Sequence, residues 1–310
     1  MRAVFADCTE ELGQVIRASQ LPLPEEIKIN YGSPTEADLH RLCVGVEVLF
    51  VEHTAVAPAV IDACPSLRAI IFLGTGAGTY VDLEHAARRG IKVLTTPGYG
   101  DRAVAEHALA LLFAAARGIA GMDRQIRDGI WQPTGGMQLG GRKIAIVGLG
   151  GIGATMAQLV SSIGMEVAAW NRTPRDHASY VADLDEVLAD ADVVSLHLSL
   201  NSETHSLIDR RRIELPARGF LLVNTARAQL VDEAALLEGL ASGQVGHAAL
   251  DVFAEEPLPL KNPYAELPNT TLTAHSAYMT SAAFEELWRR GLKAYRTVID
   301  SERAEQQLGS

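Results

Sequence analysis

The chain has 310 residues, of which 48% are hydrophobic and 21% are charged, which is typical of a globular protein with about two domains. Its formal net charge of −11 argues against nucleic acid or an anionic membrane surface as the main partner. The three cysteines, Cys8, Cys43 and Cys64, form no C-x-x-C pair, so we expect reduced thiols and a cytoplasmic protein.

Strand and helix patterns alternate along the first third of the chain. Short apolar runs predict strands at residues 2–6, 27–30, 48–51, 68–73 and 91–95, separated by helix patterns at 10–19, 35–42, 57–63 and 81–89. This alternation predicts a parallel sheet with helices on both faces, in which ligands bind beyond the carboxyl ends of the strands. Because the chain opens on a strand pattern and its longest apolar run covers only residues 108–116, we expect neither a signal peptide nor a membrane span.

Two loops in this region are candidates for binding. The loop Gly74-Thr75-Gly76-Ala77-Gly78 follows the fourth expected strand and offers backbone N–H groups to a small anion. The loop Glu52-His53-Thr54 follows the third expected strand and is placed to line the same cleft. His53 has two interpretations, a substrate contact or an exposed loop histidine, and the sequence leaves both open.

A cluster of helix breakers, Thr96-Pro97-Gly98-Tyr99-Gly100, indicates that the chain crosses between domains. An alanine- and leucine-rich helix pattern follows over residues 101–117 and continues towards residue 128. Glu106 and His107 interrupt its apolar character, which favours a buried helix at a domain or subunit interface over a membrane span.

The next segment has the pattern of a dinucleotide site. A buried strand pattern at residues 143–147 runs into Gly148-Leu149-Gly150-Gly151-Ile152-Gly153, followed by a helix pattern at 154–163 and a strand at 166–170. Gly148 permits the tight turn, Gly150 lets the backbone approach a pyrophosphate, and Gly153 lets helix and strand pack closely. The helix N-terminus directs free N–H groups at the phosphates. A glycine-rich turn without a ligand is the alternative, but the order strand, turn, helix favours cofactor binding.

The end of the second strand of this segment bears on the choice between NAD and NADP. NAD-specific folds carry an acidic residue there for the ribose hydroxyls, whereas this chain has Asn171-Arg172-Thr173. Neutral and cationic side chains suit a 2′-phosphate, so we favour NADP(H) over NAD(H). In the alternative interpretation Arg172 is a solvated surface residue.

The rest of the chain predicts further strands at 193–198, 219–224, 248–252 and 270–273, which complete a six-stranded doubly wound sheet, and a last helix at 280–299. Three of these strands end in polar motifs: Asn224-Thr225-Ala226-Arg227, Leu250-Asp251-Val252-Phe253-Ala254-Glu255-Glu256-Pro257 and Thr273-Ala274-His275-Ser276. Each motif alone has a structural explanation, but together they place arginine, glutamate and histidine at one edge of the sheet.

With these motifs in this order, the chain resembles the D-isomer-specific 2-hydroxyacid dehydrogenase family, which contains glyoxylate/hydroxypyruvate reductases and D-phosphoglycerate dehydrogenases. The matching pieces are Thr96-Pro97-Gly98 with Val104-Ala105-Glu106, the glycine motif from Gly148 to Gly153, Asn224-Thr225-Ala226-Arg227, Leu250-Asp251-Val252-Phe253 with Glu256-Pro257, and His275. They extend from about residue 70 to the end, whereas the earlier residues match in pattern only.

The resemblance implies roles for three catalytic residues. Arg227 would grip the substrate carboxylate and carbonyl with its rigid guanidinium fork. His275 would be the general acid that protonates the carbonyl oxygen as hydride arrives from the nicotinamide. Glu256 would hydrogen-bond His275 and keep its proton available, with the neighbouring Glu255 as the alternative partner.

The resemblance also implies binding residues and an architecture. Substrate contacts are expected at Gly76, Ala77, His53 and Tyr99, and no metal ligands are expected. Cofactor contacts are expected at Gly148, Leu149, Gly150, Gly151, Ile152, Gly153, Asn171, Arg172, Thr173, Leu198, Thr204, Thr225, Ala226, Asp251 (through the nicotinamide carboxamide) and Ala277. The implied fold is α/β with two doubly wound parallel sheets: a Rossmann cofactor domain, residues 98–277, inserted into a flavodoxin-like substrate domain, residues 1–97 plus 278–310. The implied assembly is a homodimer packed through the long helix.

The expected function is that of an NADPH-preferring, D-specific reductase of a small 2-keto acid, with glyoxylate or hydroxypyruvate favoured. Gly78-Thr79-Tyr80 replaces the family's common Gly-x-Asp-Asn, and Ser199 stands where proline is common, which should loosen that turn. These departures bear on the substrate pocket rather than on the reaction. The alternatives are a cofactor-sensing, corepressor-like scaffold with little turnover, and a dehydrogenase of formate or phosphite. Formate enzymes carry glutamine where this chain has Glu256, which argues against that alternative.

Overall fold

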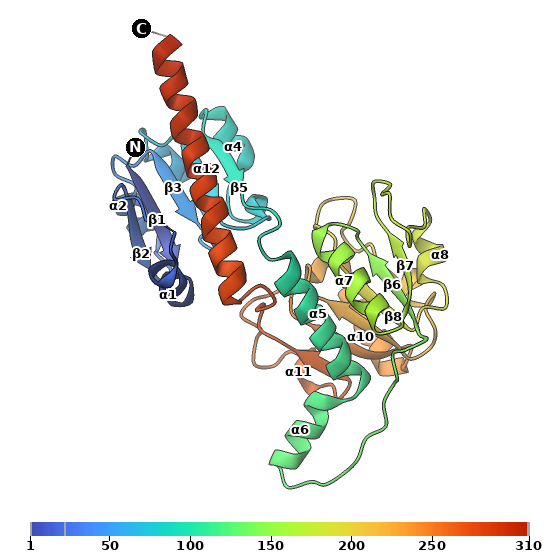
Figure 1. Ribbon diagram of the computed structural model, residues 1–310. Helices are drawn as coiled ribbons and strands as arrows, with labels where there is room; N and C mark the ends of the chain where they lie inside the picture. Colours follow the sequence, from blue (N-terminus) through green and yellow to red (C-terminus); the bar gives the residue numbers. More distant parts are fainter. Residues whose placement is uncertain (1, 22, 309–310) are drawn as a thin grey trace. The chain divides into compact units, whose positions relative to one another are not determined.

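The computed structural model describes residues 2–21 and 23–308 and contains two compact units (Figure 1). Unit 1 comprises Met1–Gly100 and Met279–Ser310, and unit 2 comprises Asp101–Tyr278. The chain therefore leaves unit 1 once, forms all of unit 2, and returns to complete unit 1.

Unit 1 is built on a five-stranded parallel sheet with the strand order β2-β1-β3-β4-β5. The strands are β1 (Ala3–Cys8), β2 (Ile27–Tyr31), β3 (Val48–Val51), β4 (Ala69–Phe72) and β5 (Lys92–Thr95). The connecting helices are α1 (Glu10–Ala18), α2 (Glu36–Leu42), α3 (Pro58–Asp62), the 3₁₀ turn η1 (Ala77–Thr79) and α4 (Leu83–Arg88). The three central strands are buried along their whole length because helices cover both faces, which explains their continuous apolar sequences.

Side chains alternate between the two faces of this sheet. Val4, Leu49 and Ile70 pack in one cluster with residues of α2, α3 and α4. Phe5 and Phe50, one position along each strand, face the other way towards α12 (Ser281–Leu308). Trp288 of α12 is fully buried and stacks on Phe5 with ring centroids 6.2 Å apart, so the last helix of the chain closes this core.

Unit 2 is built on a six-stranded parallel sheet with the order β11-β10-β9-β8-β6-β7. The strands are β6 (Lys143–Val147), β7 (Glu166–Trp170), β8 (Val193–Leu196), β9 (Phe220–Asn224), β10 (Val245–Leu250) and β11 (Thr270–Leu272). The helical segments are α5 (Asp101–Ala116), α6 (Ile119–Arg127), α7 (Gly151–Ser162), α8 (Leu184–Leu188), α9 (Arg210–Ile213), the 3₁₀ turn η2 (Ala228–Leu230), α10 (Glu233–Ser242) and α11 (Pro263–Glu266).

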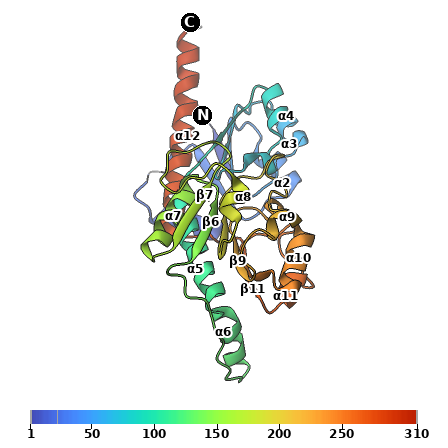
Figure 2. The ribbon, with the colours of Figure 1, turned by 90° about the vertical axis from the view of Figure 1, so that its right-hand side faces the viewer.

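Two apolar clusters flank this second sheet. One contains Ile144 and Ile146 of β6 together with residues of α5 and α7. The other contains Ala145 and Val147, which face the opposite way, with residues of α8 and α10. Figures 1 and 2 show α7 and α8 on opposite sides of β6 and β7. The predicted fold class, two doubly wound parallel-sheet α/β domains, is therefore confirmed.

Several predicted boundaries were wrong. The helical segment that was expected over 101–117 and on towards 128 is present but forms two helices, because Gly118 adopts a left-handed conformation (φ 60°) and α6 begins in a new direction, 64° from α5. Helix α7 begins at Gly151 rather than at residue 154, β10 covers Val245–Leu250 rather than 248–252, and α12 extends beyond residue 299.

In the part of the chain that the structure describes, no single helix is both long enough and apolar enough to cross a membrane. The bent pair α5 and α6 together reach the length and apolar composition of a span, and α5 places six of its residues in the interior of unit 2.

Candidate active site

The glycine turn between β6 and α7 is shaped by close packing. A Cβ atom on Gly148, where φ is 110°, would lie 2.6 Å from the carbonyl oxygen of His197. A Cβ on Gly153 would lie 1.8 Å from the carbonyl oxygen of Gly148. On Gly151 it would lie 1.8 Å from Oδ2 of Asp101, the first residue of α5. The backbone of unit 2 therefore requires glycine at Gly148 and Gly153, whereas at Gly151 the obstacle is the Asp101 side chain.

Gly150 is different, and it provides the test of whether a dinucleotide fits. Its φ of −76° is open to any residue, and a Cβ there would meet no atom within 4 Å. It is the N-cap of α7, and no side chain caps the free N–H groups of that helix. Open space above uncapped N–H groups and the positive end of a helix dipole fits a pyrophosphate.

Asn171 at the end of β7 holds the glycine turn in place. Its side-chain oxygen accepts a hydrogen bond from the backbone N–H of Leu149 at 3.0 Å, and its amide nitrogen donates to the carbonyl of Thr173 at 2.7 Å. The exposed Arg172 forms an ion pair with Glu203, with Nη1 2.6 Å from Oε2. Asn171 thus orders the turn, whereas Arg172 lies at the surface with a charged partner.

The loop after β8 also borders the glycine turn. Leu198 lies beside Gly148, with its Cδ2 3.0 Å from the position of a Cβ there. The buried Thr204 donates its hydroxyl to the carbonyl of Ser199 at 2.8 Å. Ser199 stands where proline is common in the family. The hydrogen bond from Thr204 to Ser199 restrains this turn although the proline is absent.

Asn224 fixes the turn that presents Arg227. Its buried side-chain oxygen accepts the N–H of Ala226 at 3.0 Å, and its amide donates to the carbonyl of Arg227 at 2.9 Å. The half-buried Arg227 donates Nη1 to the carbonyl of Ala226 at 2.6 Å. Between them, the buried hydroxyl of Thr225 has no hydrogen-bond partner among the described residues. A buried polar atom that lacks a protein partner at this edge of the sheet is a second feature that fits a bound cofactor.

Asp251 anchors the loop that follows β11. Its fully buried carboxylate accepts hydrogen bonds from the Thr273 hydroxyl at 2.5 Å and from the backbone N–H groups of Ser276 and Ala277, each at 3.0 Å. His107 of α5 lies with Nε2 3.0 Å from the Thr273 hydroxyl. Burial alone would raise the pKa of Asp251, but His107, the Thr273 hydroxyl and the two backbone N–H groups outweigh it and hold the pKa below its ordinary value.

This anchored loop carries His275, whose backbone is left-handed at φ 50°. The Nδ1 atom of His275 lies 2.6 Å from Oε2 of Glu256. The other oxygen of Glu256 accepts the backbone N–H of Phe253 at 2.8 Å, which orients the carboxylate. Because a carboxylate only accepts, Nδ1 carries the hydrogen and Nε2 remains for another partner. The structure thus joins His275 to Glu256 and not to the neighbouring Glu255, although both glutamates are exposed.

The chain is similar to proteins of one family. Residues 109–277 match the family model described as D-isomer specific 2-hydroxyacid dehydrogenase, NAD binding domain. The chain belongs to this family. It is an enzyme, an oxidoreductase, and its NAD-binding domain lies in unit 2.

The relatives of this dehydrogenase carry several names. It is 34% identical over 252 residues to the glyoxylate reductase of Korarchaeum cryptofilum, which covers 76% of this chain and 75% of the relative. It is 30% identical over 296 residues to the glycerate dehydrogenase of Methylorubrum extorquens, covering 92% of each. The solved structure of the TT0316 protein from Thermus thermophilus matches with a TM-score of 0.81 and 33% identity over 93% of each chain. The chain spans about half the length of the D-3-phosphoglycerate dehydrogenases that it matches.

The predicted substrate residues of this dehydrogenase lie in unit 1. Gly76 and Ala77 follow β4 and lead into η1. The loop with His53 is fixed by the buried Asp7, whose Oδ2 accepts the backbone N–H of His53 at 2.7 Å. The His53 ring is half-exposed and meets the ring of Tyr80 edge-on, with centroids 6.1 Å apart. Tyr99 belongs to this unit as well, whereas Arg227, Glu256 and His275 belong to unit 2.

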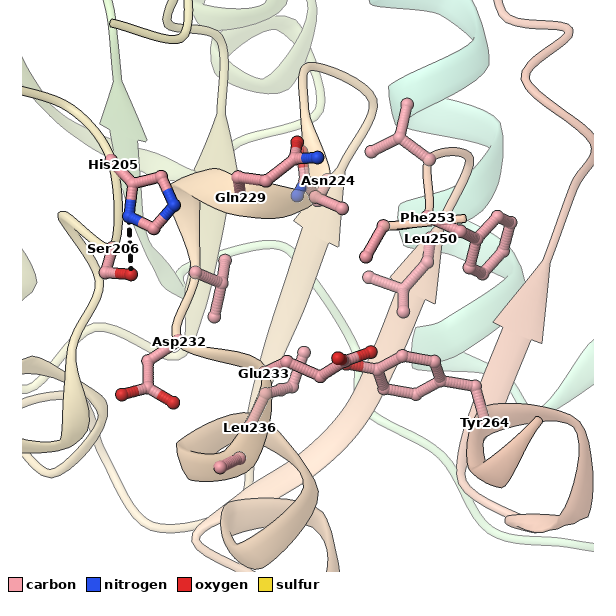
Figure 3. A pocket seen from close by; sticks show the side chains of 15 residues that line it. His205, Ser206, Asn224, Gln229, Asp232, Glu233, Leu236, Leu250, Phe253 and Tyr264 are labelled. Carbon is pink, nitrogen blue, oxygen red and sulfur yellow. Dashed lines mark hydrogen bonds between the residues drawn. The ribbon is translucent and has the colours of Figure 1, made fainter. Parts of the chain in front are cut away.

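A cavity of about 360 Å³ lies beside the ends of β9 and β10 in this dehydrogenase. Figure 3 labels ten of its lining residues: His205, Ser206, Asn224, Gln229, Asp232, Glu233, Leu236, Leu250, Phe253 and Tyr264. Burial raises the pKa of Tyr264, and the Glu233 carboxylate adds to this. None of the predicted substrate, cofactor or catalytic residues is among those that line it.

Four residues that shape this site had no individual role predicted from the sequence, although two of them stand in the polar strand-end motifs: His107, Asn224, Glu203 and Thr273. Asn224 and Thr273 are polar residues at or just beyond the ends of buried strands, and this position is a usable signal of a structural anchor. His107 was noted only as an interruption of an apolar helix. Glu203 pairs with Arg172 from a different loop, and local sequence gives no sign of that.

Proposed function

We propose that this dehydrogenase is an NADPH-preferring, D-specific reductase of a small 2-keto acid, glyoxylate or hydroxypyruvate. The observation that carries the proposal is the hydrogen bond between His275 and Glu256 in the same unit as Arg227. A histidine held by a carboxylate through Nδ1, with Nε2 left for another partner, suits proton transfer to a carbonyl oxygen. An arginine suits the carboxylate that a 2-keto acid carries.

In the proposed reaction, the bound nicotinamide cofactor supplies the hydride. Arg227 binds the substrate carboxylate and orients the keto group. His275 gives the proton on Nε2 to the carbonyl oxygen, and the carboxylate of Glu256 balances the imidazolium charge before that transfer. The glycine turn from Gly148 to Gly153 holds the pyrophosphate, with Leu149, Ile152, Leu198, Thr204, Thr225, Ala226, Asp251 and Ala277 among the cofactor contacts.

The preference for NADPH rests on the end of β7. Asn171 and Thr173 are neutral and Arg172 is cationic, so no carboxylate of this segment opposes a 2′-phosphate. Unit 1, the proposed substrate domain, contributes the backbone of Gly76 and Ala77 together with His53 and Tyr99. The two-domain assignment, residues 98–277 for the cofactor and the remainder for the substrate, is part of the same proposal.

The proposed homodimer uses α5, α6 and the residues after α6 as far as Trp131. Helix α6 has no buried residue, and apolar side chains of this segment are exposed in the single chain. They are Phe113, Ile119, Ile126, Ile130 and Trp131, and Trp131 is 85% exposed. Several exposed apolar side chains within one short segment are a reason to propose a subunit interface there. Light scattering on the purified protein, compared with an Ile126→Glu and Trp131→Glu double variant, tests this part of the proposal.

The experiment that tests the reaction is a spectrophotometric assay at the absorbance band of the reduced nicotinamide. Glyoxylate, hydroxypyruvate, pyruvate and phenylpyruvate are each tested with NADPH and with NADH, and the Arg227→Ala variant is the blank. Turnover of glyoxylate or hydroxypyruvate with NADPH that disappears in Arg227→Ala supports the proposal. Preference for NADH contradicts the cofactor assignment, and equal turnover by Arg227→Ala contradicts the role of that arginine. The relatives are named reductases or dehydrogenases, which disfavours the scaffold alternative.

A further inference from the structure

The guanidinium of Arg172 is engaged by a carboxylate from another loop. Arg172 follows β7, and Glu203 lies 31 residues further along the chain in the loop after β8. Their Nη1 and Oε2 atoms are 2.6 Å apart, and both side chains are more than half exposed. The residue that would attract a 2′-phosphate therefore already has an anionic partner of this chain's own.

The backbone around Glu203 is held firmly. The side-chain oxygen of Asn201 accepts the backbone N–H of Glu203 at 2.9 Å and that of Thr204 at 3.0 Å. The buried hydroxyl of Thr204 donates to Ser199 at 2.8 Å, which closes the same turn. The turn therefore fixes the backbone position from which the Glu203 side chain reaches Arg172.

We infer that Glu203 is a specificity-determining residue that weakens the binding of 2′-phosphorylated dinucleotides by occupying Arg172. The inference rests on the proposed use of Arg172 for the cofactor. A 2′-phosphate must displace the Glu203 carboxylate from the guanidinium and then tolerate that negative charge nearby. A dinucleotide without the 2′-phosphate carries no group that competes for Arg172. Glu203 therefore lowers the affinity for NADPH and leaves that for NADH nearly unchanged.

The test is direct titration of NADPH and NADH, without any keto acid, followed by nucleotide fluorescence or calorimetry. In Glu203→Gln, Kd for NADPH falls about fivefold at low ionic strength, in line with the strength of an exposed ion pair, and Kd for NADH stays within about twofold. The NADPH effect shrinks when salt is raised because exposed charges are screened. Introducing Glu203→Gln into Arg172→Gln has a smaller effect on NADPH than in the wild type, because the guanidinium is already gone and only the direct repulsion between Glu203 and the 2′-phosphate is relieved.

Glu238→Gln is the matched control. Glu238 forms an exposed ion pair with Arg210 in the same unit, with Oε1 2.8 Å from Nη2, and should leave both dissociation constants unchanged. An unchanged Kd for NADPH in Glu203→Gln, or an equal change for NADH, overturns the inference. If the wild type prefers NADH but Glu203→Gln still tightens NADPH alone, the proposed preference fails and the role of Glu203 stands. The experiment therefore distinguishes the proposed preference for NADPH from the proposed role of Glu203.

Discussion

The carboxylate of Asp251 accepts a hydrogen bond from the backbone N–H of Ala277, 26 residues further along the chain, with Oδ2 3.0 Å from the nitrogen. Its other oxygen accepts from Thr273 and Ser276, so one buried side chain fixes the loop on both sides of His275. His275 adopts a left-handed backbone, which costs energy for a residue with a side chain. The hydrogen bonds to Asp251 offset that cost and hold the imidazole near Glu256.

Replacing Asp251 by asparagine should therefore lower both the stability of the fold and the rate of turnover. An amide presents one acceptor and one donor to a site that contains donors only, so at least one hydrogen bond to a charged group is lost. We expect the free energy of unfolding, measured by urea denaturation without cofactor, to fall by about 2 kcal/mol. A free energy of unfolding equal to that of the wild type would mean that this carboxylate does not anchor the loop.

Glu256→Gln should reduce turnover while the neighbouring Glu255→Gln does not. Glu256 accepts from both His275 and the backbone of Phe253, whereas Glu255, which is equally exposed, makes neither contact. A neutral amide gives a weaker hydrogen bond to an imidazolium, and a loss of about 1.4 kcal/mol corresponds to about tenfold in kcat. Steady-state kinetics of both variants with the best keto acid provide the measurement. Equal losses in the two variants would contradict the assignment of Glu256 as the partner of His275.

Gly150 and Gly153 should respond differently to the same substitution. In Gly150→Ala the new Cβ meets no protein atom within 4 Å. We therefore expect the free energy of unfolding to stay within about 0.5 kcal/mol of the wild-type value. The methyl group would occupy the space in which the pyrophosphate is proposed to bind, so Kd for NADPH and for NADH should rise about tenfold or more.

In Gly153→Ala the new Cβ would lie 1.8 Å from the carbonyl oxygen of Gly148, so the turn itself must shift. We expect a loss of stability of about 1–3 kcal/mol in the absence of any nucleotide. Thermal melting with and without NADPH distinguishes the two variants. A destabilised Gly150→Ala protein would show that the open space there is not available.

The stability of the protein should fall between pH 6.5 and pH 4. Burial lowers the pKa of His197 to about 4, and burial together with Arg124 lowers the pKa of His247 to about 4. The unfolded chain takes up protons on both imidazoles near pH 6.5, whereas the folded chain does so only near pH 4. Stability that is present above pH 6.5 is therefore lost as the pH falls through this window.

The pH-dependent loss of stability can be measured for His197 alone. A shift of this size for His197 corresponds to a loss of about 2 kcal/mol between pH 7 and pH 5. His197→Gln removes this titration, so its free energy of unfolding should depend less steeply on pH than that of the wild type. Urea denaturation at pH 7 and pH 5 measures the difference, and identical slopes would contradict the effect of burial on His197.

Much of the architecture follows from local patterns in the sequence. The strand at Val48–Val51 has the predicted bounds because four consecutive apolar residues fill a position buried on both faces. The glycine turn could be located because Gly148, Gly150 and Gly153 have the spacing of a dinucleotide motif between a strand pattern and a helix pattern. The break at Gly118 could not, because a glycine within an alanine-rich helix is tolerated and only its left-handed backbone reveals the end of α5.

The sequence predicted which residues form the candidate site, but not most of the contacts between them. The approach of Glu256 to His275 was implied by family resemblance, while the roles of both residues stay predictions. The clamp by Asp251 and the pairing of Arg172 with Glu203 depend on segments far apart in sequence. No local periodicity reports such contacts, since they arise only when the strands of one sheet place their ends together.

Helix α12 has a consequence for the order in which the protein is made. Trp288 covers Phe5 of β1 and Phe50 of β3, two neighbouring strands at the centre of the unit 1 sheet. During translation these rings emerge early, and their cover emerges only after every residue of unit 2. Unit 2 can therefore fold on the ribosome before α12 has been synthesised. Until then the aromatic face of the unit 1 sheet stays exposed, and chaperones bind such exposed hydrophobic surface. Because the chain also contains Trp131 and Trp170, indole fluorescence would report the docking of Trp288 on this sheet only in a variant that lacks those two residues.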